Sequence, residues 1–279
     1  MKFNQNLTEI ANMNPKLVDI HSHILPYIDD GADDWDSSLA MLKNAEAEGI
    51  VAIVATPHIL HKNDFNMEPR IFRTYKELCQ RSKDAGLKIT IYLGCEIYAQ
   101  PDISLDHKIA TLNSNKKYFL VEFPMNSIPK FVPEQFFNFI VNEQIPIVAH
   151  PERNIGFQKR PQLIYEFVQR GSLMQINEGS LRGRYGEMAK LLAFKMIENN
   201  LAHFVASDGH KPDSRNVTLV ESYNIIFEKF GREIADQLFS ANPIKAIKGD
   251  AIQISNPFPI ENELKPKFWQ RLNFFKKRT

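Results

Sequence analysis

The chain alternates short, strongly apolar stretches with longer stretches of amphipathic pattern. Near-continuous apolar runs rich in β-branched residues are typical of parallel strands that are covered on both faces. Such runs predict seven strands, at residues 17–21, 50–56, 88–94, 118–123, 145–150, 172–177 and 203–208. Helical periodicity predicts six helices between and after them, at residues 35–48, 69–85, 133–143, 161–170, 185–199 and 216–230.

Residues at the ends of these segments agree with the helix predictions. Gly49, Gly86 and Gly171 follow predicted helices, where a left-handed C-cap favours glycine. Pro69 and Pro161 open predicted helices. Alternation of strands and helices along the whole chain indicates βα units around a parallel sheet. Seven strands in such a series favour one α/β domain with barrel-like closure over two domains.

Composition narrows the class of protein further. The 279 residues suit one large domain, and a net charge of +1 gives no reason to expect nucleic acid as the partner. Only two cysteines are present, too few for a disulfide scaffold, which fits a reducing cytoplasm. The N-terminal residues lack the pattern of a signal peptide, and no apolar run approaches the roughly 18 residues of a membrane helix. We therefore expect a cytoplasmic protein.

Carboxylates and imidazoles follow almost every predicted strand. Parallel strands of a barrel bring their carboxyl ends to one face, where barrel enzymes bind substrate. The candidates, in chain order, are His21, His23, Asp29, Asp30, His58, Glu96, Glu122, His150, Asp208 and His210. Side chains at positions i and i+2 of a strand point the same way, so His21 and His23 can grip one ion together. The sequence leaves open whether Asp29 binds the metal itself or supports a residue that does.

This donor chemistry suits particular metals. Imidazole and carboxylate without thiolate favour Mn, Fe or Zn, often in clusters that share a carboxylate. A single H-x-H pair is weak support for a metal site. The same residue types at the ends of several further strands make a polymetal site the better interpretation.

The motifs also resemble a known family. DIHSHILPYIDDGADD, TPH, GCEIY, VEFP, AHPERN and SDGH, over residues 18–215, are similar to the polymerase and histidinol phosphatase (PHP) superfamily. Within it they resemble the capsule-associated bacterial protein-tyrosine phosphatases of the CpsB/YwqE type. The resemblance implies a distorted (β/α)7 TIM-like barrel, the PHP fold, as a single domain over residues 1–255. It also implies three divalent metal ions, with manganese most expected and iron or zinc as alternatives.

Residue roles follow from the matched motifs. The resemblance implies that His21, His23, Glu96 and Asp208 hold one ion, that Glu96 bridges to a second ion with Glu122 and His150, and that Asp30, His58 and His210 form the third set. Arg153 and Arg215 match the arginines expected to hold the phosphate. Gly209 stands where the family more often has alanine, and we expect it to loosen its loop without removing a donor.

The physical chemistry of phosphate monoesters agrees with this assignment. Divalent ions neutralise the charge of the ester and lower the pKa of a bound water, which then attacks phosphorus. The planar fork of arginine suits two phosphate oxygens at once. The leaving phenolate needs only modest protonation, because a phenol has a pKa of about 10. His58, His210 or a metal-bound water could supply that proton, and the sequence does not choose between them.

Other phosphate chemistries are not supported. A cysteine-based phosphatase needs an arginine at a fixed short spacing after its nucleophile, and at that spacing Cys79 is followed by Ala85 and Cys95 by Pro101. No G-x-x-x-x-G-K-[ST] motif for a phosphate-binding loop is present.

Three functions compete at this point. The first is a metal-dependent protein-tyrosine phosphatase that regulates a bacterial tyrosine kinase of capsule or exopolysaccharide synthesis. The second is a small-molecule phosphomonoesterase, similar to a histidinol phosphatase, that uses the same metals behind a narrower mouth. The third is a non-catalytic barrel that binds metal and a partner. The two arginines argue against the third, because a structural metal needs no phosphate clamp. The sequence leaves the oligomeric state open.

The last residues differ from the rest of the chain. Residues 256–279 mix aromatic with basic side chains, such as Phe268 and Trp269 beside Lys267 and Arg271. A terminal helix packed on the barrel explains this composition, and peripheral contact with a membrane or a partner is the alternative.

Overall fold

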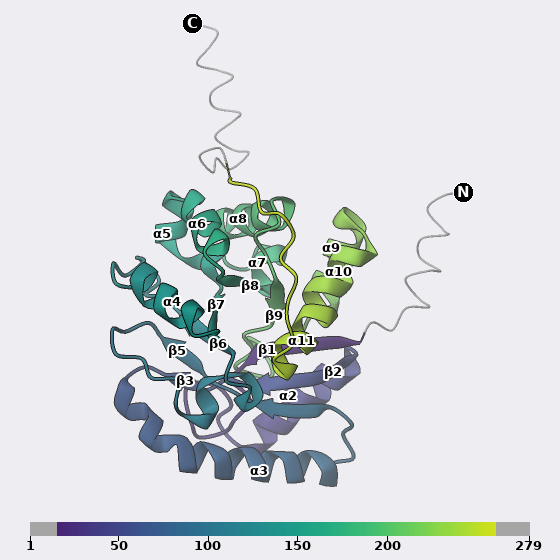
Figure 1. Cartoon of the computed structure of the whole chain (residues 1–279). Helices are drawn as coiled ribbons and strands as arrows, with labels where there is room; N and C mark the ends of the chain where they lie inside the picture. Colours follow the sequence, from purple (N-terminus) through teal and green to yellow (C-terminus); the bar gives the residue numbers. More distant parts are fainter. Residues whose placement is uncertain (1–15, 261–279) are drawn as a thin grey trace, which may run out of the picture.

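Parallel strands form the centre of the structure, a computed structural model that describes residues 16–260 (Figure 1). The strands are β1 (Leu17–Ser22), β2 (Ile50–Ala55), β3 (His58–Ile59), β4 (Thr90–Leu93), β5 (Glu96–Tyr98), β6 (Tyr118–Glu122), β7 (Ile145–Ala149), β8 (Leu173–Asn177) and β9 (Phe204–Ala206). Every pairing between them is parallel. The predicted α/β fold with a parallel sheet is therefore confirmed.

All seven predicted strands are present, and two of them are followed by short strands, β3 and β5, that lie beyond the predicted residues 50–56 and 88–94. The second continues from β2 into β3 after Pro57, which has no N–H to donate to a neighbouring strand. The third continues from β4 into β5 after Gly94 and Cys95. The Gly94 N–H donates to the Ala55 carbonyl at 2.9 Å and the Glu96 N–H to the Pro57 carbonyl at 3.1 Å. Each interrupted strand thus keeps its course along its neighbour.

The strands form two sheets, with orders β1-β2-β4 and β3-β5-β6-β7-β8-β9. The outer strands β1 and β9 meet at one isolated parallel bridge between Ser22 and Gly209. Beside it, the His23 N–H donates to the Gly209 carbonyl at 2.8 Å and the Asp208 N–H to the His21 carbonyl at 2.9 Å. Among the described residues the ladder is therefore discontinuous, in contrast to the single closed sheet of a regular barrel.

Helices surround these strands. They are α2 (Trp35–Ala47), α3 (Glu68–Asp84), α4 (Val132–Val141), α5 (Ile155–Lys159), α6 (Gln162–Gln169), α7 (Glu178–Arg182), α8 (Glu187–Glu198), α9 (Val220–Phe230), α10 (Arg232–Asp236) and α11 (Asn242–Lys248). Short 3-10 turns occur at Lys62–Met67, Lys108–Ala110, Leu112–Ser114 and Pro151–Arg153, and a π-helical turn at Gln237–Ala241. In Figure 1 the strands lie between α3 on one side and α5, α6 and α8 on the other.

The six predicted helices are present with small shifts at their ends. Asp34 explains where α2 begins, because its carboxylate accepts a hydrogen bond from the Ser37 N–H at 2.8 Å as an N-cap. The prediction missed α5, α7, α10 and α11. Helices of five to seven residues are too short to show helical periodicity.

The core explains why the strands read as continuous apolar runs. Leu120 and Ile147 belong to a buried cluster on one face of the strands, whereas Val121 and Val148 belong to a second cluster on the other face. Successive strand residues alternate between the faces, so both faces need apolar side chains. This double cover leaves the carboxyl ends of the strands as the place for polar chemistry.

Part of the predicted tail is described. Residues 256–260 have no regular secondary structure, and the Phe258 N–H donates to the Asn199 carbonyl at 2.9 Å. Residues 261–279, on which the predicted membrane or partner contact depends, lie outside the described residues. Between residues 16 and 260, no helix combines the length and apolar character needed to cross a membrane.

Candidate metal centre

The nine predicted metal-binding side chains lie together at the carboxyl ends of the strands. Their donor atoms form four overlapping groups, within each of which all donor atoms lie within 4.8 Å of one another: His23, Asp30, His58 and His210; His21, His23 and Asp208; His21, Glu96 and His150; and His58, Glu96 and Glu122. Because the groups share members, the arrangement suits several neighbouring ions rather than one isolated ion.

The deepest part of the cluster brings four donors to one point. The Nε2 atoms of His21 and His23 lie 3.2 Å apart. Glu96 Oε2 lies 3.2 Å from His21 Nε2 and 3.4 Å from His23 Nε2, and Asp208 Oδ1 lies 3.6 Å from both. All four side chains are buried. Converging imidazole nitrogens and carboxylate oxygens without thiolate fit a divalent transition metal.

Glu96 connects this point to the next group of donors. Its Oε1 lies 3.1 Å from His150 Nε2, and its Oε2 lies 3.1 Å from His58 Nδ1. Glu122 completes the group, with Oε2 at 3.7 Å from His150 Nε2. His58 Nδ1 is buried, and the part of the chain that the structure describes offers it no hydrogen-bond partner. An electron-rich nitrogen facing a carboxylate without a hydrogen bond fits an ion between them.

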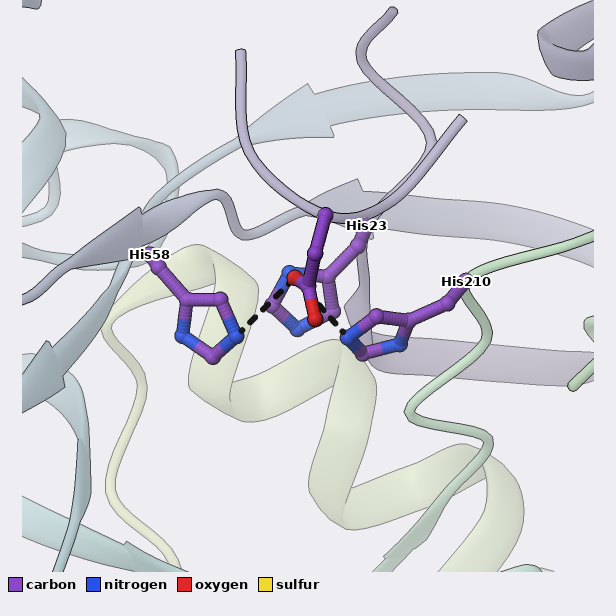
Figure 2. Close-up of side chains that lie close together, drawn as sticks. His23, His58 and His210 are labelled. Atoms are coloured by element: carbon purple, nitrogen blue, oxygen red, sulfur yellow. Dashed lines mark ion pairs between the residues drawn. The ribbon is translucent and has the colours of Figure 1, made fainter. Parts of the chain in front are cut away.

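The remaining donors form the rim of the cluster (Figure 2). Asp30 Oδ1 lies 3.4 Å from the Nε2 atoms of both His58 and His210, and the Asp30 side chain is 68% exposed. The His23 and His210 rings are 3.9 Å apart between centroids. His23, which the sequence assigned only to the first ion, thus also lies within reach of the third set.

The backbone directs two of the donors by an unusual conformation. His150 and Asp208, each just after a strand, have φ angles of 34° and 52°, in the left-handed region. For a residue with a Cβ atom this conformation costs about 1–2 kcal/mol. Such strain persists where surrounding contacts hold it, and it concentrates at functional sites.

Three oxygen acceptors set the protonation of the histidines. His21 Nδ1 donates to Gln175 Oε1 at 3.0 Å, His23 Nδ1 to Asp29 Oδ2 at 2.8 Å, and His210 Nδ1 to the Asp208 carbonyl at 2.9 Å. These oxygens only accept, so each Nδ1 carries a hydrogen and each Nε2 is turned toward the cluster.

Two of these supporting residues were unresolved or missed in the sequence. Asp29 was open between ligand and support, and its contacts place it as a support, since it also accepts from the His58 N–H at 3.0 Å. Gln175 was missed. Its only signal was a polar residue in the middle of the buried strand β8, between the apolar residues Met174 and Ile176.

Burial and neighbouring charges shift the protonation of the donors in opposite directions. Burial alone would raise the pKa of Glu96, but His21, His150 and His23 hold that pKa well below its usual range. Burial and the charge of Glu96 raise the pKa of Glu122 to about 7. Neighbouring carboxylates with such different pKa values are typical of functional sites.

His210 has a defined protonation state. Burial and the nearby charge of His23 lower the pKa of His210 to about 3. The ring is neutral at pH 7, with its one hydrogen on Nδ1. A neutral ring whose Nε2 faces the cluster suits a metal ligand.

The two predicted phosphate-binding arginines meet on one carboxylate. Asp208 Oδ2 accepts hydrogen bonds from Arg153 Nη1 at 2.8 Å, Arg215 Nη2 at 2.6 Å and Asn177 Nδ2 at 2.9 Å. Its other oxygen faces the histidines of the cluster. The Arg153 guanidinium also lies over the Tyr185 ring, 4.1 Å from its centroid. Asp208 therefore joins the donor cluster to the arginines. The sequence analysis did not predict the parts of Asn177, which donates to Asp208, and Tyr185, which stacks on Arg153.

One arginine retains an unused donor. Arg215 Nε is buried and has no hydrogen-bond partner among residues 16–260. A buried N–H without an acceptor is costly, so an incoming anion at this position gains a charge-assisted hydrogen bond.

Gly209 does not loosen its loop. A Cβ atom added to it would lie 2.7 Å from Val217 Cγ2 and 3.0 Å from the Val217 backbone nitrogen. The Gly209 N–H also donates to Ser207 Oγ at 3.0 Å. The glycine permits close packing against Val217, so the expectation of a looser loop was wrong.

Comparison with known proteins identifies the family. A sequence model of the family described as "Capsular polysaccharide synthesis, CpsB/CapC" matches residues 17–248, a span that contains all nine donors and both arginines. The chain belongs to the CpsB/CapC family. The resemblance found in the sequence motifs is thereby confirmed.

Individual members of the CpsB/CapC family are similar over most of their length. The chain is 34% identical over 250 residues to the tyrosine-protein phosphatase YwqE of Bacillus subtilis (strain 168), covering 88% of this chain and 97% of YwqE. It is 37% identical over 210 residues to the putative tyrosine-protein phosphatase CapC of Staphylococcus aureus, covering 75% of this chain and 82% of CapC.

The fold is also similar to a crystal structure from the same family. The matching chain comes from the crystal structures of YwqE from Bacillus subtilis and CpsB from Streptococcus pneumoniae, which are described as unique metal-dependent tyrosine phosphatases. It has a TM-score of 0.82 and 33% identity, and covers 88% of this chain and 100% of that chain. Family membership thus rests on sequence and fold together.

Proposed function

We propose that this protein is a metal-dependent protein-tyrosine phosphatase that acts on a bacterial tyrosine kinase of capsule or exopolysaccharide synthesis. The names of its CpsB/CapC relatives support the reaction class. The observation that carries the proposal is the pair of arginines on Asp208 beside a cluster of metal donors, with Arg215 Nε left free for an anion.

Three divalent ions, manganese most expected, fit the donor cluster. When bound, such ions neutralise phosphate charge and lower the pKa of a coordinated water. The first set is His21, His23, Glu96 and Asp208, the second is Glu96, Glu122 and His150, and the third is Asp30, His58 and His210, with His23 close by. Gln175 orients the imidazole of His21 and Asp29 that of His23, so both rings are held in position to bind a metal ion.

Arg153 and Arg215 are assigned to the phosphate group. Each is held by Asp208 Oδ2 through one terminal nitrogen, which leaves other N–H groups of the planar guanidinium for phosphate oxygens. The stacking of Arg153 on Tyr185 limits the rotation of that guanidinium. Held in advance, both arginines lose less conformational entropy when substrate binds.

We extend the proposal to architecture and location. Residues 1–255 belong to a distorted (β/α)7 barrel, with residues 256–279 as a tail. The bridge between Ser22 and Gly209 supports this, because it joins the outer strands across the two sheets. Cytoplasmic location is supported by Cys79 and Cys95, which are both unpaired cysteines.

The test compares two substrates on one preparation. The metal-stripped, manganese-reloaded protein is given a phosphotyrosyl peptide and histidinol phosphate, and phosphate release is measured. Faster release from the peptide, lost in Glu96→Gln, is the expected result. Preference for histidinol phosphate would assign the protein to the small-molecule phosphatases. Metal binding without release from either substrate would leave a non-catalytic metal-binding protein.

A further inference from the structure

A cavity of about 300 Å³ lies between helices α4 and α6, apart from the donor cluster. Its lining includes the buried rings of Phe136 and Phe167 and the side chains of Ile140 and Leu163. Phe137 also lines it and is 62% exposed. We call this cavity the α4–α6 groove. An apolar hollow of this size is large enough for one or two side chains of another molecule.

The rim of the α4–α6 groove is basic. Lys130, Arg160 and Arg170 line it and are exposed, with Glu166 as the acidic residue among the lining side chains. Within the described part of the chain none of these three cations forms an ion pair. Unpaired cations around an apolar hollow complement a ligand that is apolar at one point and acidic beside it.

A buried hydroxyl inside the α4–α6 groove is also unsatisfied. Ser172 lines the cavity and is 1% exposed, yet its Oγ has no hydrogen-bond partner between residues 16 and 260. Buried hydroxyls normally have a partner. A polar atom of a bound ligand would provide one.

Exposed apolar residues connect the α4–α6 groove to the metal centre. Ile155 follows Arg153 by two residues, and its N–H donates to the Met125 carbonyl at 2.8 Å. Ile155 and Met125 are 39% and 41% exposed. Ile128, which lines the groove, packs close to Gly156, where an added Cβ would lie 3.2 Å from its side chain. A chain leaving the arginines can therefore follow apolar surface into the groove.

We propose that the α4–α6 groove binds a segment of the phosphotyrosyl substrate protein that flanks the phosphotyrosine. An apolar side chain of that segment fills the cavity, acidic side chains meet Lys130, Arg160 and Arg170, and a polar atom reaches Ser172 Oγ. This inference rests on the proposed function, because it takes the substrate to be a protein. It makes the groove a determinant of which phosphotyrosyl segments are hydrolysed.

Steady-state kinetics on the full-length manganese-loaded protein tests the proposal. The substrates are p-nitrophenyl phosphate and a phosphotyrosyl peptide whose flank carries one apolar and several acidic residues. Arg160→Glu should raise KM for the peptide about tenfold and leave kcat unchanged, because charge reversal at the rim repels the flank. Turnover of p-nitrophenyl phosphate should not change. Lys43→Glu, the same charge reversal at an exposed position of α2, is the matched control.

Other results would overturn the proposal. One is an unchanged peptide KM in Arg160→Glu, and another is an equal loss on both substrates. A concentration-dependent dimer that Arg160→Glu abolishes, with peptide KM unchanged, would assign the groove to a second copy of the chain.

Ser172→Ala gives a second test that does not depend on charge. The hydroxyl has no hydrogen-bond partner among residues 16–260, so its removal should leave the thermal midpoint unchanged or slightly raised. Peptide KM should rise by a factor of about three, from loss of one neutral hydrogen bond. An unchanged KM would exclude contact with this hydroxyl and overturn that part of the proposal.

The groove can be tested even if the proposed function fails. If the wild-type protein releases phosphate from neither substrate, the phosphatase proposal fails. Fluorescence anisotropy with the labelled, unphosphorylated flank peptide then tests the groove alone. Weaker binding to Arg160→Glu than to wild type would support the groove, and equal binding would overturn it.

Discussion

The metal centre has a buried half and an exposed half, and the two are held in different ways. In the buried half the side chains of His21, Glu96 and Asp208 are 0%, 1% and 3% exposed. In the exposed half Asp30 is 68% and His58 is 19% exposed. The buried donors have further partners behind them, such as Gln175 for His21 and Arg153 for Asp208. Within residues 16–260, the ion pairs of Asp30 are those with the two facing histidines, His58 and His210.

This difference indicates what each half contributes. Buried charges are tolerated only when they are paired, so the inner donors are already fixed in the metal-free protein. The exposed carboxylate of Asp30 interacts through solvent-screened charges, and such contacts contribute little to stability. The inner half should therefore determine folding and activity together, whereas the rim should affect metal retention, and activity through it, without affecting folding.

Glu96→Gln should have the largest effect, because Glu96 is the buried donor that joins two groups. The substitution should remove about 4 kcal/mol of the stabilisation that bound metal gives to the transition state, which corresponds to roughly a thousandfold lower kcat/KM. The measurement is turnover of a phosphotyrosyl peptide together with bound metal per chain. Glu68→Gln is the matched control, since Glu68 also accepts from a histidine, His107 at 3.0 Å, away from the cluster. Activity within tenfold of wild type would contradict a central role for Glu96.

Asp29→Asn should lower metal affinity about 10–100-fold, the usual effect of losing a partner that orients a ligating histidine. Asp29 accepts from His23 Nδ1 and from the His58 N–H, so it supports both halves of the centre. Titration calorimetry with Mn²⁺ measures the change. The exposed Asp33→Asn serves as the control. An affinity equal to wild type would place Asp29 outside the supporting set.

Asp30→Asn should weaken binding of one ion by about tenfold or less, because an exposed ligand competes with water for the same position. The thermal midpoint of the metal-free protein should not change, in contrast to Asp208→Asn, which leaves two half-buried arginines without their charged acceptor. Differential scanning calorimetry of both metal-free variants makes the comparison. Equal destabilisation would remove the distinction between the two halves.

The smallest effect concerns pH and Glu122. Its pKa of about 7 in the fold lies above the ordinary value of 4.5. The metal-free fold therefore binds an extra proton, and the resulting stability is fully present below pH 4.5 and lost as the pH rises through 7. Relative to Glu122→Gln, the metal-free wild type should lose free energy of unfolding between pH 5 and 8, measured by urea denaturation.

Metal binding should follow the opposite trend for the same group. A carboxylate ligand must be ionised, so the contribution of Glu122 to Mn²⁺ affinity should fall as the pH drops below about 7. Parallel pH curves for wild type and Glu122→Gln, in stability and in affinity, would show that Glu122 does not titrate in this range.

Much of the molecule followed from the sequence because the relevant signals are local. Apolar runs located seven of the nine strands, as at Ile145–Ala149, and glycines such as Gly49 marked helix ends. Residue types at strand ends predicted the donors, since parallel strands deliver their carboxyl ends to one face. The missing arginine after each cysteine excluded cysteine-based phosphatases.

Only the tertiary structure decided how these parts combine. His21 and Asp208 are 187 positions apart in the chain, and the junction of β1 with the end of β9 brings them together. Three features depend on the directions that side chains take at and beyond the strand ends. Asp208 contacts both the donor cluster and the arginines, Gln175 accepts from His21, and His23 lies in two donor groups. Left-handed turns at His150 and Asp208 set some of these directions, and no periodic pattern encodes them. Local periodicity specifies elements, whereas contacts between distant strand ends specify the site.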